Sequence, residues 1–117
     1  MEERRQLPRW RIGKAARLTF GNGGPSTNGH ITDIHLKGMS VGLPEPLCDQ
    51  GPFGIRVVLG DDCRFDVEAE VKWTREENGQ YVHGLVFSKI LEDSKDRIYA
   101  YISEQCLNQF HARWWSL

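Results

Sequence analysis

Residues 62–75, DCRFDVEAEVKWTR, alternate strictly between two kinds of side chain. Apolar residues occupy the odd positions from Cys63 to Trp73, and charged or polar residues occupy the even positions. Side chains of a β-strand point alternately to opposite faces, so the pattern predicts one long strand with a single buried face. By its place in this alternation, Trp73 belongs to the buried face.

The segments around this stretch predict further strands joined by short turns. A Gly-Asp-Asp turn signal over 60–62 precedes it, and Asn78-Gly79, the strongest short hairpin signal, follows it. Strand patterns occupy residues 54–60 and 80–87 on either side, and earlier residues 14–20 and 29–43, the last interrupted at Gly38. Loops are expected over 21–29 and 44–52. Five or six strands in this order favour an antiparallel barrel or sandwich.

The end of the chain has helical spacing. Leu91, Ile98, Ile102 and Cys106 fall on one stripe, which predicts a helix of about four turns packed against the strands. We therefore expect one domain, divided into an N-terminal arm over 1–13, a β-barrel over 14–88 and a helix over 89–112.

Composition narrows the function classes. The 117 residues carry a net charge of −1, which disfavours a nucleic-acid polymer as partner, because that partner requires a broadly basic surface. The three cysteines lack the spacing of a disulfide scaffold or a zinc site, so reduced thiols are expected. No apolar run is long enough to span a bilayer, and the N-terminus lacks a secretory signal, which predicts a cytoplasmic protein.

Basic charge is concentrated near the N-terminus. Six basic residues and no acid lie between Arg4 and Arg17. Pro8 prevents a regular helix through the segment around Arg5 and Arg9, so an extended arm is expected. The planar arginine fork binds phosphate, or the O6/N7 edge of guanine, through two hydrogen bonds. Such a local cluster suits a compact anion, although a solvated basic tail is the alternative.

A second polar element is Asp33-Ile-His35-Leu-Lys-Gly38. In a strand Asp33 and His35 share one face, whereas Ile34 points to the other, towards the core. The Asp33 carboxylate is suited to accept hydrogen bonds from the N1–H and N2 amino group of guanine. Gly38 permits a turn or a close approach of the backbone to a ligand.

The two elements in this order resemble the signature of PilZ domains, with Arg-x-x-x-Arg near the N-terminus followed by Asp-x-Ser-x-x-Gly. ITDIHLKGMSVGL and YVHGLVF extend the likeness over nearly the whole chain. PilZ domains are bacterial receptors for the second messenger cyclic di-GMP. The resemblance implies a mainly β fold, a six-stranded antiparallel barrel with a C-terminal helix.

The resemblance also implies roles for individual residues. Arg5 and Arg9 match the two motif arginines, which hold phosphates and guanine in the family, and Arg4 matches a frequent extra arginine. Asp33 and Gly38 match the two ends of the second motif.

Two positions leave alternatives open. His35 stands where the family usually has serine, and it either hydrogen-bonds to or stacks on the ligand, or crowds the site. Trp73 lies where some family members place a residue against a guanine, and otherwise it is a core or rim tryptophan.

The sequence shows no enzyme motif, and no cofactor is expected. The favoured function is a cyclic di-GMP receptor that relays the signal to an unidentified downstream protein, as a monomer or weak dimer. The alternative is a protein-interaction adaptor on the same fold that does not bind nucleotide. Trp114 and Trp115 either dock a partner or cover the barrel end.

Overall fold

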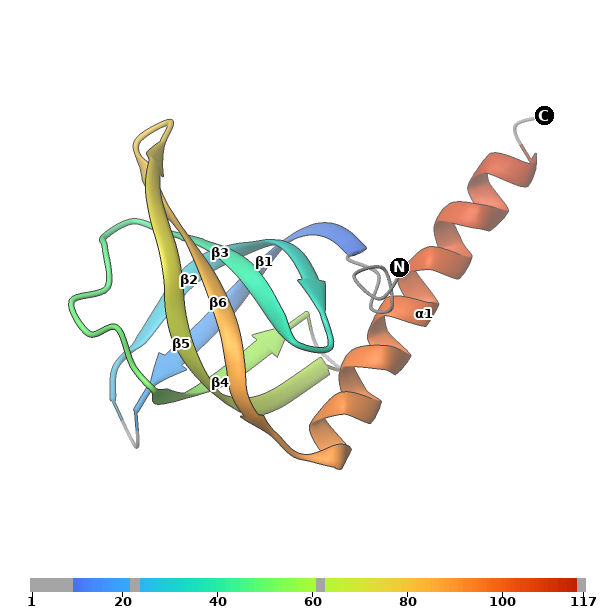
Figure 1. Cartoon of the computed structure of the whole chain (residues 1–117). Helices are drawn as coiled ribbons and strands as arrows, with labels where there is room; N and C mark the ends of the chain where they lie inside the picture. Colours follow the sequence, from blue (N-terminus) through green and yellow to red (C-terminus); the bar gives the residue numbers. More distant parts are fainter. Residues whose placement is uncertain (1–9, 22–23, 61–62, 116–117) are drawn as a thin grey trace, which may run out of the picture.

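The computed structural model describes residues 10–21, 24–60 and 63–115, in which six strands precede one helix (Figure 1). The strands close into an antiparallel barrel in the order β1-β2-β3-β6-β5-β4, which confirms the expected barrel. The elements are β1 (Trp10–Phe20), β2 (Ser26–His35), β3 (Gly38–Leu43), β4 (Phe53–Leu59), β5 (Cys63–Glu77), β6 (Gln80–Ile90) and α1 (Glu92–Trp115).

The barrel interior is filled by aliphatic and aromatic side chains. In the first half of β5 every second residue is buried, from Cys63 to Ala69, as the alternation predicts. Leu18, Ile31, Val41 and Val57 complete this core from the other strands. Burial of such side chains contributes roughly 1.5–3 kcal/mol each, which makes the alternating strands the main source of stability.

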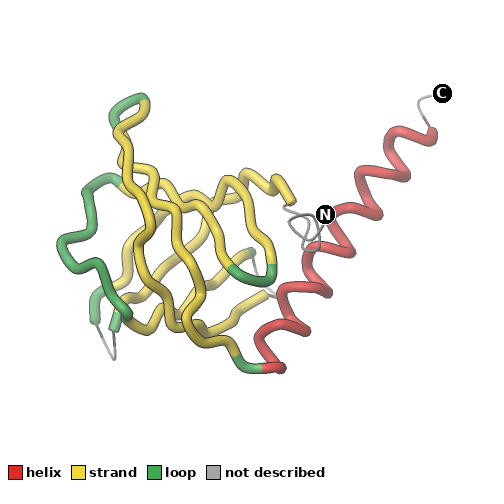
Figure 2. The backbone as a smooth tube through the Cα atoms, in the orientation of Figure 1, coloured by secondary structure: helices red, strands yellow, loops and turns green. Residues whose placement is uncertain are grey.

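The hairpin between β5 and β6 has the predicted turn. Asn78 and Gly79 both have positive φ, of 53° and 79°, the conformation for which an Asn-Gly pair is favoured. Figure 2 shows this hairpin extending beyond the rest of the barrel.

Two strand boundaries differ from the expected ones. β1 begins at Trp10 and not at Lys14, because a bulge at Gly13, with φ of 52°, interrupts its alternation. β2 begins at Ser26, within the stretch expected to be a loop, because this part of the chain pairs with the end of β1.

The helix is also displaced from its expected range. β6 continues to Ile90 and α1 runs over Glu92–Trp115, so the helix starts later than residue 89 and is longer than four turns. Ile98 and Ile102 are buried in the core as predicted. Leu91 precedes the helix and is 63% exposed, so it does not belong to the buried stripe. The side chain of Cys106 lies outside the described residues.

The start of α1 is hydrogen-bonded to β5 through two side chains, and the guanidinium of Arg97 donates to the carbonyl of Arg64 at 3.1 Å. The hydroxyl of Ser94 donates to the carbonyl of Asp66 at 2.9 Å and accepts from its amide at 3.3 Å. Farther along, α1 extends away from the barrel (Figure 1).

Candidate functional site

One row of residues crosses five strands of the barrel side by side. Arg11 pairs with Asp33, Asp33 with Ser40, Ser40 with Gly84, and Gly84 with Trp73. Adjacent strands lie about 4.8 Å apart, and directly opposed residues point to the same side of a sheet. The register therefore brings Asp33 and Trp73 onto one outward surface, with the small residues Ser40 and Gly84 between them.

A second row lies one step along the strands. His35 pairs with Gly38, and Gly38 pairs with Val86. Asp33, His35 and Trp73 line one hollow of about 80 Å³. The remaining lining residues are Met39, Ser40, Lys72, Gly84, Leu85 and Val86. We call the surface around this hollow the β2–β3–β6 face.

Trp73 faces outward and not into the core. A bulge between Val71 and Trp73 adds one residue to β5 relative to β6, which reverses the alternation after Val71. Trp73 is consequently 41% exposed, and its indole lies directly on Gly84, where any Cβ would collide with the ring. The expectation that Trp73 belongs to the buried face is therefore wrong.

A charged residue adjoins the indole. The guanidinium carbon of Arg75 lies 4.9 Å from the centroid of the Trp73 ring, within cation–π range. Arg75 also pairs with Glu77 at 3.3 Å. The indole of Trp73 thus lies between the guanidinium of Arg75 and the backbone of Gly84 on β6, at the edge of the hollow.

Gly38 occupies a position where no side chain fits. A Cβ at Gly38 would collide with the backbone carbonyl oxygen of Leu85 on the neighbouring strand. The glycine therefore allows β3 and β6 to approach closely beside His35.

The predicted arginines Arg4, Arg5 and Arg9 lie outside the described residues. The described chain nevertheless starts beside the hollow, because Trp10 pairs with Ile34, the residue between Asp33 and His35. β1 therefore begins beside the β2 residues that line the hollow.

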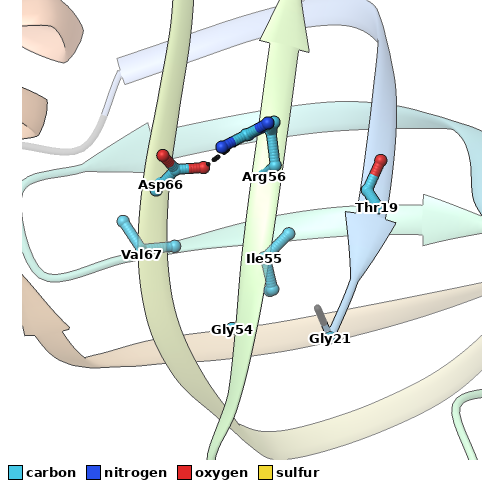
Figure 3. A pocket seen from close by; sticks show the side chains of 7 residues that line it. All are labelled: Thr19, Gly21, Gly54, Ile55, Arg56, Asp66 and Val67. Carbon is cyan, nitrogen blue, oxygen red and sulfur yellow. Dashed lines mark hydrogen bonds and ion pairs between the residues drawn. The ribbon is translucent and has the colours of Figure 1, made fainter. Parts of the chain in front are cut away.

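A larger hollow lies on the opposite wall of the barrel. It measures about 360 Å³ and is lined by residues of β1, β4 and β5 and by Gly21. Its two charged residues, Arg56 and Asp66, pair with each other at 2.9 Å (Figure 3). This hollow contains none of the predicted site residues that the structure describes.

His83 is a buried polar group inside the barrel. Its exposure is 0%, and its Nε2 accepts a hydrogen bond from the Leu47 amide at 3.1 Å. Among the described residues no group reaches hydrogen-bond geometry with its Nδ1. Burial lowers the pKa of His83 below its usual range, an effect partly offset by the backbone of Val41 and Tyr81.

A protein-family model matches most of the length of the chain. The family model described as the PilZ domain matches residues 3–104. The chain belongs to the PilZ domain family. No curated protein matches it at the sequence level.

Solved structures agree with this PilZ assignment. Escherichia coli YcgR in complex with c-di-GMP matches with a TM-score of 0.72 at 17% identity, covering 94% of this chain and 50% of that one. The Bacillus subtilis inhibitor of motility, MotI/DgrA, matches with a TM-score of 0.66 at 18% identity, covering 91% and 52%. This chain thus spans about half the length of these relatives.

The isolated PilZ domain of Escherichia coli YcgR, also with c-di-GMP, matches with a TM-score of 0.71 at 17% identity, covering 93% of this chain and 98% of that one. At these identities the matches establish the fold.

The sequence alone does not single out several of the residues that line the hollow. Ser40, Gly84 and Val86 face outward from central strands, and Lys72 is the residue added by the β5 bulge. On β3, Gly38, Ser40 and Gly42 alternate with apolar residues, and this alternation of small residues is the one sequence signal that indicates the outer surface of β3 beside Asp33 and His35.

Proposed function

We propose that this PilZ domain is a cyclic di-GMP receptor whose ligand lies on the β2–β3–β6 face. The observation that carries the proposal is the convergence of Asp33, His35 and Trp73 on one hollow. The first two come from the Asp-x-x-x-x-Gly motif of β2, and Trp73 comes from a distant strand. A carboxylate suited to a guanine edge and an exposed indole suited to stacking are what a guanine nucleotide requires.

The size of the hollow supports a ligand held from two sides. Pockets that enclose small molecules usually measure about 300–1,000 Å³, whereas this hollow measures about 80 Å³. A dinucleotide would therefore lie across the face and need a second segment to cover it. In this proposal the arginines of residues 4–9 supply the cations for two phosphates, since the chain enters β1 at Trp10, opposite Ile34.

The proposed roles follow from the chemistry of each side chain. The arginines bind phosphate and guanine, Asp33 accepts from a guanine edge, and Trp73 stacks on a base. Gly38 keeps β3 and β6 close enough for the ligand to lie flat. The proposed ligand-binding residues are Arg4, Arg5, Arg9, Asp33, His35, Gly38 and Trp73.

The signal is proposed to pass to a downstream protein, with no enzymatic step and no cofactor. Among the described residues no helix has the length and hydropathy needed to cross a membrane. We propose a cytoplasmic location and a monomer or weak dimer. The second candidate is a PilZ adaptor that does not bind nucleotide, and a binding measurement separates the two.

Calorimetric titration with cyclic di-GMP tests the proposal. Arg5→Ala and Arg9→Ala should each weaken binding roughly ten- to hundredfold, because each removes charge-assisted hydrogen bonds of about 1.5–3 kcal/mol. Arg64→Ala is the matched control, since this exposed arginine lies nine residues before Trp73 on the same strand. Its affinity should equal that of the wild type.

Titrations with other nucleotides decide whether the protein recognises cyclic di-GMP specifically or binds any anion of similar charge. GTP, cyclic GMP and a single-stranded oligonucleotide should bind much more weakly than cyclic di-GMP. Equal binding to all four, or equal losses in all three arginine variants, would contradict a specific site. No binding of cyclic di-GMP to the wild type would favour the adaptor.

A further inference from the structure

A further hollow lies where the end of β6 leads into α1, and its chemistry differs from that of the two hollows already described. It measures about 480 Å³, within the range of about 300–1,000 Å³ that is usual for pockets that hold a ligand. Its lining comes from the β2–β3 turn, the end of β6 and the first turn of α1. None of these residues lines the hollow proposed to bind cyclic di-GMP. The two hollows are therefore distinct, and we call this one the lysine hollow.

The floor of the lysine hollow is apolar. Leu36, Phe87 and Ile90 line it, and all three are half-buried and pack against the barrel core. The backbone amide of Phe87 donates to the carbonyl of Lys37 at 2.8 Å, which holds the β2–β3 turn against β6. The floor is therefore part of the barrel itself and offers apolar contact to an occupant.

Three lysines surround this floor. Lys37, Lys89 and Lys95 line the hollow, and no described aspartate or glutamate is among the lining residues. Lys37 and Lys89 form no ion pair with any residue that the structure describes. Because three ammonium groups around one apolar hollow repel one another, they favour an anionic occupant.

Two carboxylates lie near these lysines, and both are engaged at the surface. Glu92 binds Nζ of Lys95 at 3.1 Å, and the side chain of Glu92 is 84% exposed. Glu68 stands opposite Lys89 in the strand register, and its carboxylate accepts from the hydroxyl of Ser88 at 3.4 Å. Exposed ion pairs contribute little to stability, so a carboxylate from outside can replace Glu92 at Lys95 with little loss.

The position of the lysine hollow suits the transfer of a signal. On β6, residues 84–86 line the hollow proposed to bind cyclic di-GMP, and residues 87–90 line the lysine hollow. The two sites are thus consecutive along one strand. This arrangement permits a partner to dock beside the nucleotide without replacing it.

We propose that a downstream protein docks in the lysine hollow through an acidic segment that places one large apolar side chain on the floor. Carboxylates on either side of this anchor bind the lysines, and the buried anchor supplies apolar contact. A peptide side chain reaches into a hollow, whereas the flat surface of an anionic membrane would meet only its rim. The proposal rests on the proposed function only for the signal that this partner receives.

Selection from a displayed library of random peptides, with the full chain as bait, tests the proposal. We expect the enriched peptides to carry several Asp or Glu residues around one large apolar residue. Their affinity, measured by fluorescence anisotropy, should fall about tenfold in the double variant Lys37→Ala/Lys89→Ala, because two ion pairs are lost. Lys14→Ala/Arg17→Ala is the matched control and should bind as the wild type does. It removes the same charge from exposed positions of β1 that line none of the three hollows.

Two results would overturn the proposal directly. One is the absence of acidic sequences among the enriched peptides, and the other is an equal affinity of these peptides for the wild type and for Lys37→Ala/Lys89→Ala. Vesicles of phosphatidylserine and phosphatidylcholine in equal parts are the second probe. Binding to these vesicles that the lysine variant loses, without enrichment of acidic peptides, would assign the lysine hollow to a membrane surface instead.

Titration with cyclic di-GMP separates this proposal from the proposed function. Lys37→Ala/Lys89→Ala should bind the nucleotide within about twofold of the wild type, because neither lysine lines the nucleotide hollow. A loss of about tenfold would place these lysines in the nucleotide site and overturn the docking proposal. If the wild type fails to bind cyclic di-GMP, the proposed function fails, and the peptide affinities still decide whether the lysine hollow binds an acidic segment.

Discussion

The two opposite walls of the barrel differ in how their charged side chains are used. On the wall formed by β1, β4 and β5, Arg56 and Asp66 pair with each other across adjacent strands. On the β2–β3–β6 face, Asp33 and His35 instead gather with Trp73 over a surface of glycine and serine. The first wall thus carries an ion pair between adjacent strands, and the second carries the polar side chains that line the smaller hollow.

The backbone differs in the same way. The first half of β5 pairs with β4 without interruption from Cys63 to Ala69. The second half contains the bulge that turns Trp73 outward, and β2 has an irregularity between Ile31 and Asp33. On β5, regular alternation accompanies the uninterrupted pairing with β4, and the bulge after Val71 turns Trp73 to the outer surface, where it lines the hollow.

The largest difference between the two walls is expected in the free energy of unfolding when one glycine of each wall is replaced by alanine. Gly38→Ala would force β3 away from the Leu85 carbonyl and should lower the free energy of unfolding by about 2–3 kcal/mol. Gly54→Ala on β4 is the control, because a Cβ there meets nothing within 4 Å, and its effect should stay within about 0.5 kcal/mol. Urea denaturation measures both, and similar stabilities would refute the close approach at Gly38.

Next in size is the effect of moving the indole. In Gly84→Ala the new Cβ would displace the Trp73 ring, so cyclic di-GMP affinity should fall about tenfold, or ~1.4 kcal/mol. The tryptophan emission of the free protein should change as well. Trp73→Phe provides the reference for loss of the indole, and unchanged affinity in both variants would remove Trp73 from the site.

A smaller effect is expected in the pH dependence of stability, through the buried His83. Burial lowers the pKa of His83, so the folded protein favours the neutral ring. The contribution of this neutral ring to the free energy of unfolding is therefore fully present above about pH 6.5, the usual pKa of histidine. As pH falls below that value the unfolded chain gains a proton first, so stability declines by at most ~1.4 kcal/mol per pH unit. Thermal unfolding from pH 7.5 to 5 should show a steeper decline for the wild type than for His83→Gln, whose amide accepts from Leu47 without titrating. Parallel curves would contradict this.

The smallest effect is expected at the ion pair of the opposite wall. Arg56→Ala should leave both the free energy of unfolding and the cyclic di-GMP affinity almost unchanged, because both partners of the ion pair are exposed. A loss of affinity comparable to that of Gly84→Ala would show that the two walls are not functionally distinct.

Much of the barrel can be read from the sequence because local rules specify it. The alternation from Cys63 to Ala69, the Asn78-Gly79 turn and the buried Ile98 and Ile102 all follow from side-chain periodicity and turn chemistry. The placement of Asp33 and His35 on one outward surface follows from the same alternation.

The outward orientation of Trp73 does not follow from its own strand. A bulge is defined by the partner strand, and β6 pairs Leu85 with Val71 but Gly84 with Trp73. The start of β1 cannot be recognised from the sequence for the same reason, because the bulge at Gly13 interrupts the alternation of its side chains. Counting alternate residues along one strand therefore mispredicts which face a side chain occupies wherever that strand has one more residue than its partner.

The fastening of α1 at Ser94 has a mechanical consequence. The helix is held to Asp66 near its first turn and then continues away from the barrel. Ile98 and Ile102 anchor it further in the core, and from Ile102 to Trp115 the helix extends about 20 Å at 1.5 Å per residue. A change of about 5° in its direction would displace the last turn by about 2 Å, so small tilts of the anchored part would become displacements on the scale of a side chain at the projecting end.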